Sequence, residues 1–262
     1  MADEMRRLLL ALCFVAISAA RAAAPDLSGI RFEPHLGARL PLAAALRDET
    51  GRMVTLGAVA GGLPLVLTLG YFRCRTLCGV AREDALSALS PSGLVAGRDY
   101  RLLALSIDPS ETPDDAARAR RSALDRYPGA ANANGWRFLT APVLSVREVA
   151  EAAGFRFRPD PGSRQFLHPA GLAITQPNGT IASYALGIGY APGALRSAAL
   201  RANEGWVADF ISPVLLLCFH YDAETGRYTL SIYRALSMMA AVTALALGGV
   251  LLAAHLRPGR RA

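Results

Sequence analysis

Lysine is absent from this chain of 262 residues, and cysteine and histidine are scarce, with four of each. All 28 basic residues are therefore arginines, and the formal net charge is +7 at pH 7. The arginines are interspersed with acidic residues and form no basic stripe, so the sequence gives no indication of nucleic-acid binding. No internal repeat and no low-complexity linker divides the chain. Few side chains therefore remain as candidates for metal or thiol chemistry.

Hydrophobic segments at both ends predict export and membrane anchoring. Two arginines, an apolar stretch from residue 8 to about residue 20 and three alanines at 22–24 form the pattern of a secretory signal peptide. Residues 235–256 carry no formal charge and are long enough to span a bilayer. The arginines after this segment favour a cytoplasmic C-terminus. We therefore expect an inner-membrane protein with a single C-terminal anchor and its functional domain in the periplasm or otherwise outside the cytoplasm.

These segments divide the chain into five parts. They are a signal peptide at 1–24, a folded domain at 25–205, a hairpin extension at 206–234, a transmembrane helix at 235–256 and a cytoplasmic tail at 257–262. Roughly 210 residues lie between signal and anchor, which is enough for one domain with a sizeable core.

Strand-like and helix-like stretches alternate through the domain, which predicts an α/β fold built on a central sheet. Strands are expected at 63–71, 100–107, 172–176 and 180–185, and helices at 80–89, 113–126, 145–153 and 192–203. Thr112 is placed to cap the helix 113–126, and Pro177-Asn178-Gly179 predicts a tight turn between two strands. Residues 214–221 and 227–233 predict a further hairpin before the membrane span.

Cys74 and Cys78 are the strongest candidates for chemistry. They follow the first predicted strand and lie about one helical turn apart, so their sulfur atoms can bind one metal ion or form a disulfide. The nearby helix N-terminus, Arg73 and Arg75 favour the thiolate form, which attacks disulfides and ligates metals. A structural disulfide is the alternative, although a loop this short gains little stability from loop entropy.

His168 is the candidate third ligand. It lies in a loop before the late hairpin, and a sheet with the first strand at its centre can bring it over the cysteines. Two thiolates and one imidazole suit copper, because thiolates favour the reduced ion and imidazole tolerates the oxidised one. The alternative is a histidine that only forms hydrogen bonds within its loop.

Cys218 and His220 form a second, weaker pair. If their segment is a strand, both side chains lie on one face and can form a metal site near the membrane. The alternative is a buried apolar cysteine without a ligand role.

The cysteine spacing and the residues around it resemble the Sco/SenC family, whose members are thioredoxin-fold proteins that bind copper and support assembly of the copper centre of cytochrome oxidase. The resemblance covers about residues 42–190. It rests on four segments, which are Arg47 to Arg52; Gly70 to Cys74 with Cys78; Ser106-Ile107-Asp108-Pro109 with Thr112-Pro113; and His168 ahead of Pro177-Asn178-Gly179. The tail also resembles a membrane-anchored bacterial subset of that family.

The resemblance implies a thioredoxin-like fold, with a central mixed sheet flanked by helices. It implies that Cys74, Cys78 and His168 bind copper, and it favours a metallochaperone over an enzyme. Its partner would be the copper-bearing subunit of cytochrome c oxidase or another copper protein, to which it would deliver copper or whose thiols it would maintain. The alternative is a periplasmic thiol-disulfide oxidoreductase that uses Cys74 and Cys78 as its redox pair without a metal. A peroxide-reducing enzyme is a weaker alternative, because the sequence shows no separate resolving arrangement.

Three positions depart from the usual family pattern. Arg75 and Gly79 stand where members usually have proline after each cysteine, so the loop is expected to be more flexible and more basic. Leu167 stands where an aspartate often precedes the histidine. Without that carboxylate to orient the imidazole, copper affinity is expected to fall by about tenfold or more, unless another group takes its place.

Overall fold

The computed structural model describes residues 29–73, 80–128, 135–160 and 166–207, together with 221–222, 227–228 and 243. In these residues no helix combines the length and apolar character needed to cross a membrane. Several predictions lie outside the described residues, namely the signal peptide, the membrane span apart from Thr243, the cytoplasmic tail, Cys74, Cys78, Cys218 and His220. For these segments the expectations stay predictions.

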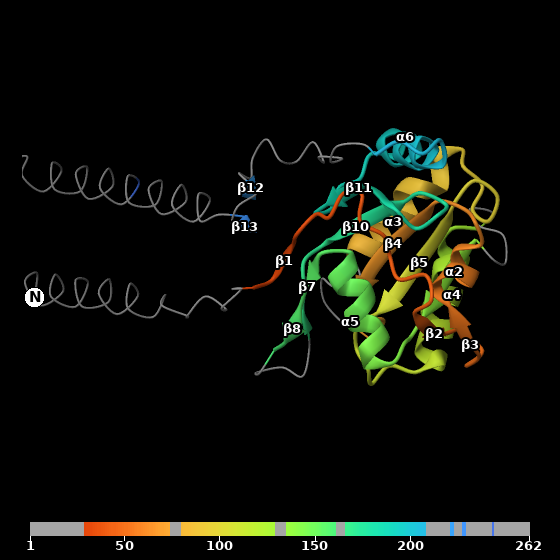
Figure 1. The fold of residues 1–262 in the computed structure, drawn as a ribbon, viewed down its shortest axis with the longest axis vertical. Helices are drawn as coiled ribbons and strands as arrows, with labels where there is room; N and C mark the ends of the chain where they lie inside the picture. The colour runs from red at the N-terminus through yellow and green to blue at the C-terminus, as the bar shows by residue number, and fades with distance from the viewer. Residues whose placement is uncertain are drawn as a thin grey trace, which may run out of the picture.

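A mixed sheet of five strands forms the centre of the domain (Figure 1). In spatial order its strands are β11 (Ile181–Leu186), β10 (Gly171–Thr175), β4 (Leu65–Gly70), β5 (Arg101–Ser106) and β6 (Trp136–Leu139). β4, β5 and β6 run parallel, whereas β10 runs antiparallel to both β4 and β11. β4 therefore lies at the middle of the sheet, as the position predicted for His168 requires.

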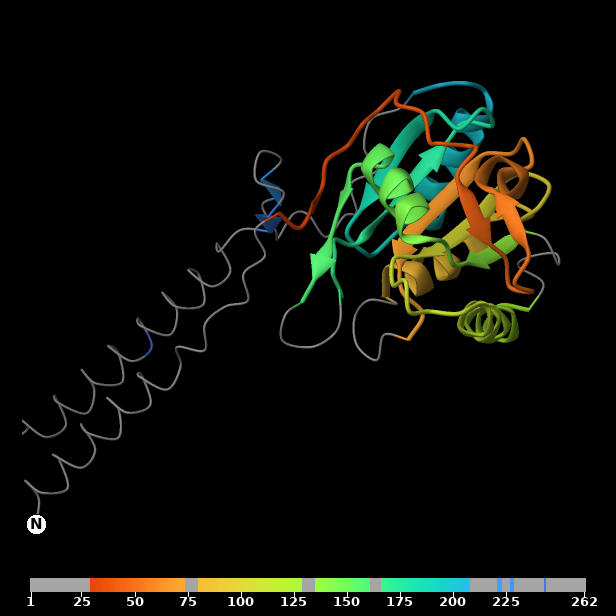
Figure 2. The same cartoon turned by 60° about the horizontal axis from the view of Figure 1, so that its bottom comes forward.

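Helices cover both faces of this sheet, which makes a three-layer α/β domain. α3 (Val80–Leu89), α4 (Pro113–Arg126) and α6 (Pro192–Asn203) bury alanine and leucine side chains in one core cluster. α2 (Leu56–Ala60) and α5 (Val143–Ala152) contribute to the second cluster. In Figure 2, α5 (green) lies in front of the strands and α6 (blue) lies behind them. With helices on both faces, β4 and β5 have almost wholly apolar sequences, as buried parallel strands require.

The predicted bounds of three helices are confirmed. α3, α4 and α6 begin and end at the expected residues. At the start of α4, the Asp115 N–H donates to the Thr112 hydroxyl over 3.3 Å, and the Thr112 N–H donates to the Asp115 carboxylate over 2.8 Å. This reciprocal cap satisfies two N–H groups that a helix start leaves unpaired. α5 begins at Val143, two residues before the expected start, and Pro142 is its N-cap residue.

The late hairpin is also confirmed. β10 pairs with β11 across the turn that Pro177-Asn178-Gly179 predicted. Gly179 has a φ of +84°, which glycine adopts without strain, and its N–H donates to the Gln176 carbonyl over 2.9 Å. Of the second predicted hairpin, the structure describes the antiparallel pair β12 (Tyr221–Asp222) and β13 (Arg227–Tyr228).

β6 and the short elements at the periphery were not predicted from the sequence. β6 is the edge strand beside β5, and its Trp136 indole N–H donates to the Tyr100 hydroxyl over 3.0 Å within the core. Burial raises the pKa of Tyr100 to about 12. The short elements are α2, the 3₁₀ turn η1 (Ser90–Ser92), and the antiparallel pairs β1 (Arg31–Phe32) with β7 (Phe155–Arg156), β2 (Ala45–Arg47) with β3 (Met53–Thr55) and β8 (Arg158–Pro159) with β9 (Phe166–Leu167).

Candidate functional site

The candidate site lies at the carboxyl end of β4, from which the chain continues into the segment of Cys74 and Cys78. β5 runs parallel to β4, and Gly70 at the end of β4 lies opposite Ser106 at the end of β5. The loops that follow the two strands therefore leave the sheet at the same edge. In open α/β sheets, ligands bind at this edge.

His168 lies beside the same edge, although it is far from Cys74 in the sequence. It precedes β10, and β10 pairs antiparallel with β4, with Leu172 opposite Thr68. Residues before Leu172 consequently run alongside residues after Thr68. The His168 ring is centred 5.8 Å from the ring of Tyr71, which stands three residues before Cys74. The structure thus places the third predicted ligand next to the segment that leads to the first one.

The surroundings of the His168 ring distinguish its two nitrogen atoms. The Nδ1 atom lies 2.9 Å from the carbonyl oxygen of Pro169, so Nδ1–H donates to that carbonyl and Nε2 keeps its lone pair. Nε2 is buried and has no hydrogen-bond partner within the part of the chain that the structure describes. Metal-binding histidines commonly donate their second ring N–H to a carboxylate or a backbone carbonyl. The Pro169 carbonyl therefore supplies the orienting contact that Leu167, in place of an aspartate, cannot supply.

Two aromatic rings, those of Tyr71 and Phe155, pack against the imidazole of His168. Phe155 of β7 is centred 5.8 Å from the His168 ring, and Phe166 packs against Tyr71 with ring centres 6.2 Å apart. This burial lowers the pKa of His168 below its usual value, and the hydrogen bond to Pro169 opposes the shift only in part. His168 is therefore neutral at pH 7, which is the form that binds metals.

The lowered pKa predicts how the stability of the metal-free chain depends on pH. The unfolded chain takes up a proton on His168 more readily than the folded chain, so protonation favours unfolding. The contribution to the free energy of unfolding is complete above the unfolded pKa of about 6.5 and is lost as the pH falls through that value toward the lower folded pKa. Urea unfolding at several pH values between about 7.5 and about 5.5 measures this loss. The loss should be smaller in His168→Phe, and equal losses in both proteins would contradict the prediction.

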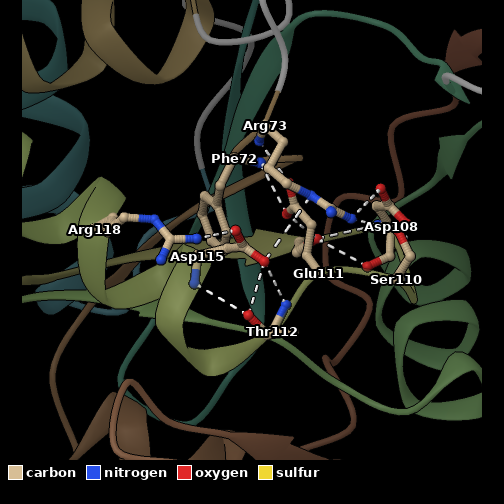
Figure 3. A network of polar contacts seen from close by, with 9 residues as sticks. Phe72, Arg73, Asp108, Ser110, Glu111, Thr112, Asp115 and Arg118 are labelled. Atoms are coloured by element: carbon tan, nitrogen blue, oxygen red, sulfur yellow. Dashed lines mark hydrogen bonds and ion pairs between the residues drawn. The ribbon is translucent and has the colours of Figure 1, made fainter.

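A buried carboxylate, Glu111, holds the backbone that leads to Cys74 (Figure 3). Its two oxygen atoms lie 2.7 and 2.8 Å from the N–H of Phe72, and one of them lies 2.5 Å from the N–H of Arg73. The Ser106 hydroxyl donates to the same carboxylate over 2.7 Å. Glu111 was not predicted from the sequence, although it stands between Pro109 and Thr112 in the third of the segments that carry the family resemblance. The signal that could have found it is an acidic residue in a loop at the end of a strand parallel to β4.

Acidic side chains surround Arg73. Its guanidinium lies 3.5 Å from the carboxylate of Asp108, 3.8 Å from that of Glu111 and 3.9 Å from that of Asp115. These carboxylates compensate the positive charge, so Arg73 should favour the thiolate form of Cys74 less than the sequence suggested. Arg75 lies outside the described residues, and its effect stays a prediction.

Of the predicted ligand set, the structure describes His168 alone. His168 and the backbone leading to Cys74 meet at one edge of the sheet, whereas the two cysteines themselves lie outside the described residues. His35 is not part of this arrangement, and its backbone N–H donates to the Tyr184 hydroxyl over 3.1 Å. Among the residues described, no group of three histidine, cysteine or acidic side chains is arranged to hold a metal ion.

No family model and no curated protein sequence matches the chain. Among solved structures, it is similar to a candidate electron transfer protein from Aquifex aeolicus VF5, with 24% sequence identity, a TM-score of 0.57, and coverage of 65% of this chain and 95% of that one. It is also similar to a SCO1/SenC family lipoprotein from Bacillus anthracis str. Ames, with 15% identity, a TM-score of 0.51, and coverage of 64% and 96%. Arabidopsis thaliana ScoI with copper bound matches with 13% identity, a TM-score of 0.50, and coverage of 66% and 100%. These similarities confirm the predicted fold, a mixed sheet flanked by helices.

Proposed function

We propose that this chain is a Sco/SenC protein that binds a copper ion through Cys74, Cys78 and His168 and passes it to the copper-bearing subunit of cytochrome c oxidase or to another copper protein. One observation carries the proposal. The Nε2 atom of His168 is buried, neutral and without a hydrogen-bond partner among the described residues, and it belongs to a ring that contacts Tyr71 just before the cysteine segment. An imidazole nitrogen left without a partner in this way is costly unless a ligand compensates it.

The chemistry of the three side chains supports copper as the ion. Thiolates are soft ligands that favour Cu(I), and imidazole binds both oxidation states of copper. Pro169 orients the imidazole, and burial keeps it deprotonated and ready to bind. Arabidopsis thaliana ScoI, which shares the fold, has been solved with copper bound. Copper is the cargo here, so the three ligands have to hold the ion and also release it to a partner by ligand exchange.

The proposal includes the location of the domain. A cleaved signal peptide at 1–24 and an anchor at 235–256 would tether the folded domain to the periplasmic face of the inner membrane. The copper-bearing subunit of an oxidase in the same membrane would then be within reach.

A thiol-disulfide oxidoreductase is the second candidate, and the similarity to the candidate electron transfer protein of Aquifex aeolicus favours it. In this reaction the thiolate of Cys74 or Cys78 attacks the disulfide of a partner and releases one partner thiolate. The thiolate of the other cysteine then attacks the bound cysteine sulfur of the mixed disulfide and releases the second partner thiolate. The partner disulfide is reduced to two thiols, and the cysteine pair is oxidised to a disulfide. This reaction does not need His168 as a ligand.

Copper loading of the reduced, full-length chain in detergent tests the proposed function. With Cu(I) offered from a competing chelator, we expect one copper ion per chain. Alkylation followed by peptide mapping should show Cys74 and Cys78 protected in the loaded sample and reactive in the same reduced chain before copper is added. If the reduced chain took up no copper, or if both cysteines of the pair stayed reactive in the loaded sample, the copper proposal would fail and the oxidoreductase would take its place.

A further inference from the structure

The backbone segment that leads into the cysteine pair has an anchor in a neighbouring loop. The Glu111 side chain comes from the loop between β5 and α4 and reaches the N–H groups of Phe72 and Arg73, as Figure 3 shows. These are the last two residues described before Cys74. Glu111 is 6% exposed as a residue, and its side chain is fully buried.

A buried carboxylate is expensive unless hydrogen bonds and an opposite charge compensate it. At Glu111 the compensating donors are the N–H groups of Phe72 and Arg73 and the hydroxyl of Ser106. The guanidinium of Arg73, 3.8 Å away, supplies the opposite charge. Three of these four groups belong to the segment that enters the cysteine pair. The cost of burying Glu111 is therefore compensated mainly by ordering that segment.

The loop after β5 does not need the Glu111 carboxylate for its own shape. The Ser110 N–H donates to the Asp108 carboxylate over 2.8 Å, and the Asp108 N–H donates to the Ser106 hydroxyl over 3.1 Å. Thr112 and Asp115 cap the helix that follows. The Glu111 backbone N–H donates to the Asp108 carbonyl within the loop, but its carboxylate, apart from the contact with Ser106, accepts hydrogen bonds from outside the loop, at the end of β4. A purely local role would leave these bonds unexplained.

The anchored segment also contacts the third candidate ligand. Tyr71 packs against the His168 ring, and the next two residues donate their N–H groups to Glu111. A fixed backbone at residues 71–73 therefore sets the position from which Cys74 departs relative to His168. We propose that Glu111 is a positioning residue, which holds this backbone so that Cys74 is presented beside His168. The inference rests on the proposed copper function for its metal readout, whereas its backbone readout is independent of copper.

Three variants of the full-length, reduced chain test the role of Glu111. Glu111→Ala removes both acceptors. Glu111→Gln keeps one oxygen that can accept from Phe72 and Arg73, and its amide N–H₂ can donate to Ser106. Asp114→Asn is the matched control, because Asp114 is an exposed carboxylate three residues away on the first turn of α4.

In Glu111→Ala, amide hydrogen exchange at Phe72 and Arg73 should be about tenfold faster, the ratio expected for the loss of one hydrogen bond. Transfer of Cu(I) from the loaded variant to a chelator should be faster by about 10- to 100-fold, as when a partner that orients a ligand is removed. Glu111→Gln should restore both rates to within a few-fold of the unmodified chain, and Asp114→Asn should change neither. If Glu111→Ala does not fold, Glu111→Asp replaces it, because it keeps the charge but is one methylene group too short.

The outcomes separate this inference from the copper proposal. Faster exchange at Phe72 and Arg73 with unchanged copper release would show that Glu111 is merely structural and would overturn the inference. Unchanged exchange would overturn it as well. If the unmodified chain binds no copper, the proposed function fails, and the rate of Cys74 alkylation takes the place of copper release. The rate of Cys74 alkylation should rise in Glu111→Ala and be close to that of the unmodified chain in Glu111→Gln. An unchanged rate in Glu111→Ala would overturn the positioning role.

Discussion

Replacing His168 with alanine is expected to lower the Cu(I) affinity of the reduced chain by more than about 100-fold. This loss exceeds the 10- to 100-fold cost of removing a residue that only orients a ligand. The reason is that the variant lacks the buried Nε2 atom, which has no other partner among the described residues. Competition with a Cu(I) chelator measures the affinity. The disulfide between Cys74 and Cys78 should still form and be reduced in the variant, because that reaction needs the two thiols alone.

Two further variants serve as controls for this experiment. His168→Phe keeps a ring between Tyr71 and Phe155 but cannot bind copper, so it should lose affinity as His168→Ala does while preserving the packing. His35→Ala removes an imidazole whose Nδ1 atom lies 3.4 Å from the Ala152 carbonyl, and it should keep full affinity. Copper bound equally tightly by all of these chains would exclude His168 as a ligand and would favour the oxidoreductase.

Replacing Gly154 with alanine is expected to destabilise the folded chain by about 3 kcal/mol or more. Gly154 has a φ of +65°, and an added Cβ atom would lie 1.6 Å from the Glu33 carbonyl oxygen. The Glu33 N–H donates to the Gly154 carbonyl over 2.6 Å, so the two backbones cannot simply separate. Urea unfolding measures the change in the free energy of unfolding.

The same substitution should also disturb the packing around His168 in the candidate site. Gly154 precedes Phe155, whose ring packs against His168. In the antiparallel pair of β1 and β7, Phe155 lies opposite Phe32. Gly37→Ala is the matched control, since Gly37 has a φ of +80° with open space around the position of the added atom. The control should cost about 1–2 kcal/mol for the backbone conformation alone. Equal costs for both variants would show that the close approach of Glu33 does not matter.

Local signals account for the elements that the sequence predicted well. α4 has a proline in its first turn and the reciprocal cap of Thr112 and Asp115, and these features act within one turn of the chain. β4 and β5 are almost wholly apolar, as expected for strands covered on both faces. Such features depend on neighbouring residues, so they can be read without knowledge of the fold.

Contacts with residues distant in the sequence determine the elements that were not predicted. β6 has only four residues, and it gains its place by pairing with β5 and by the bond from Trp136 to Tyr100. Arg137, on the same strand, lies with its guanidinium 2.9 Å from the carboxylate of Glu49. The pairs of β1 with β7 and of β8 with β9 are two residues long and join distant or loop-separated segments. Nothing in such short stretches distinguishes a strand from a loop.

The sequence by itself determined the types of residue available for a site. Its cysteine spacing and its scarcity of histidine identified Cys74, Cys78 and His168 as candidates, because few other soft or imidazole ligands exist in the chain. Only the tertiary structure decided the surroundings of His168. The antiparallel pairing of β10 with β4 brings it to Tyr71, the ring of Phe155 buries it, and Pro169 orients it. The anchor at Glu111 was likewise decided by the parallel pairing of β4 with β5, since strand pairing joins segments that no local pattern relates.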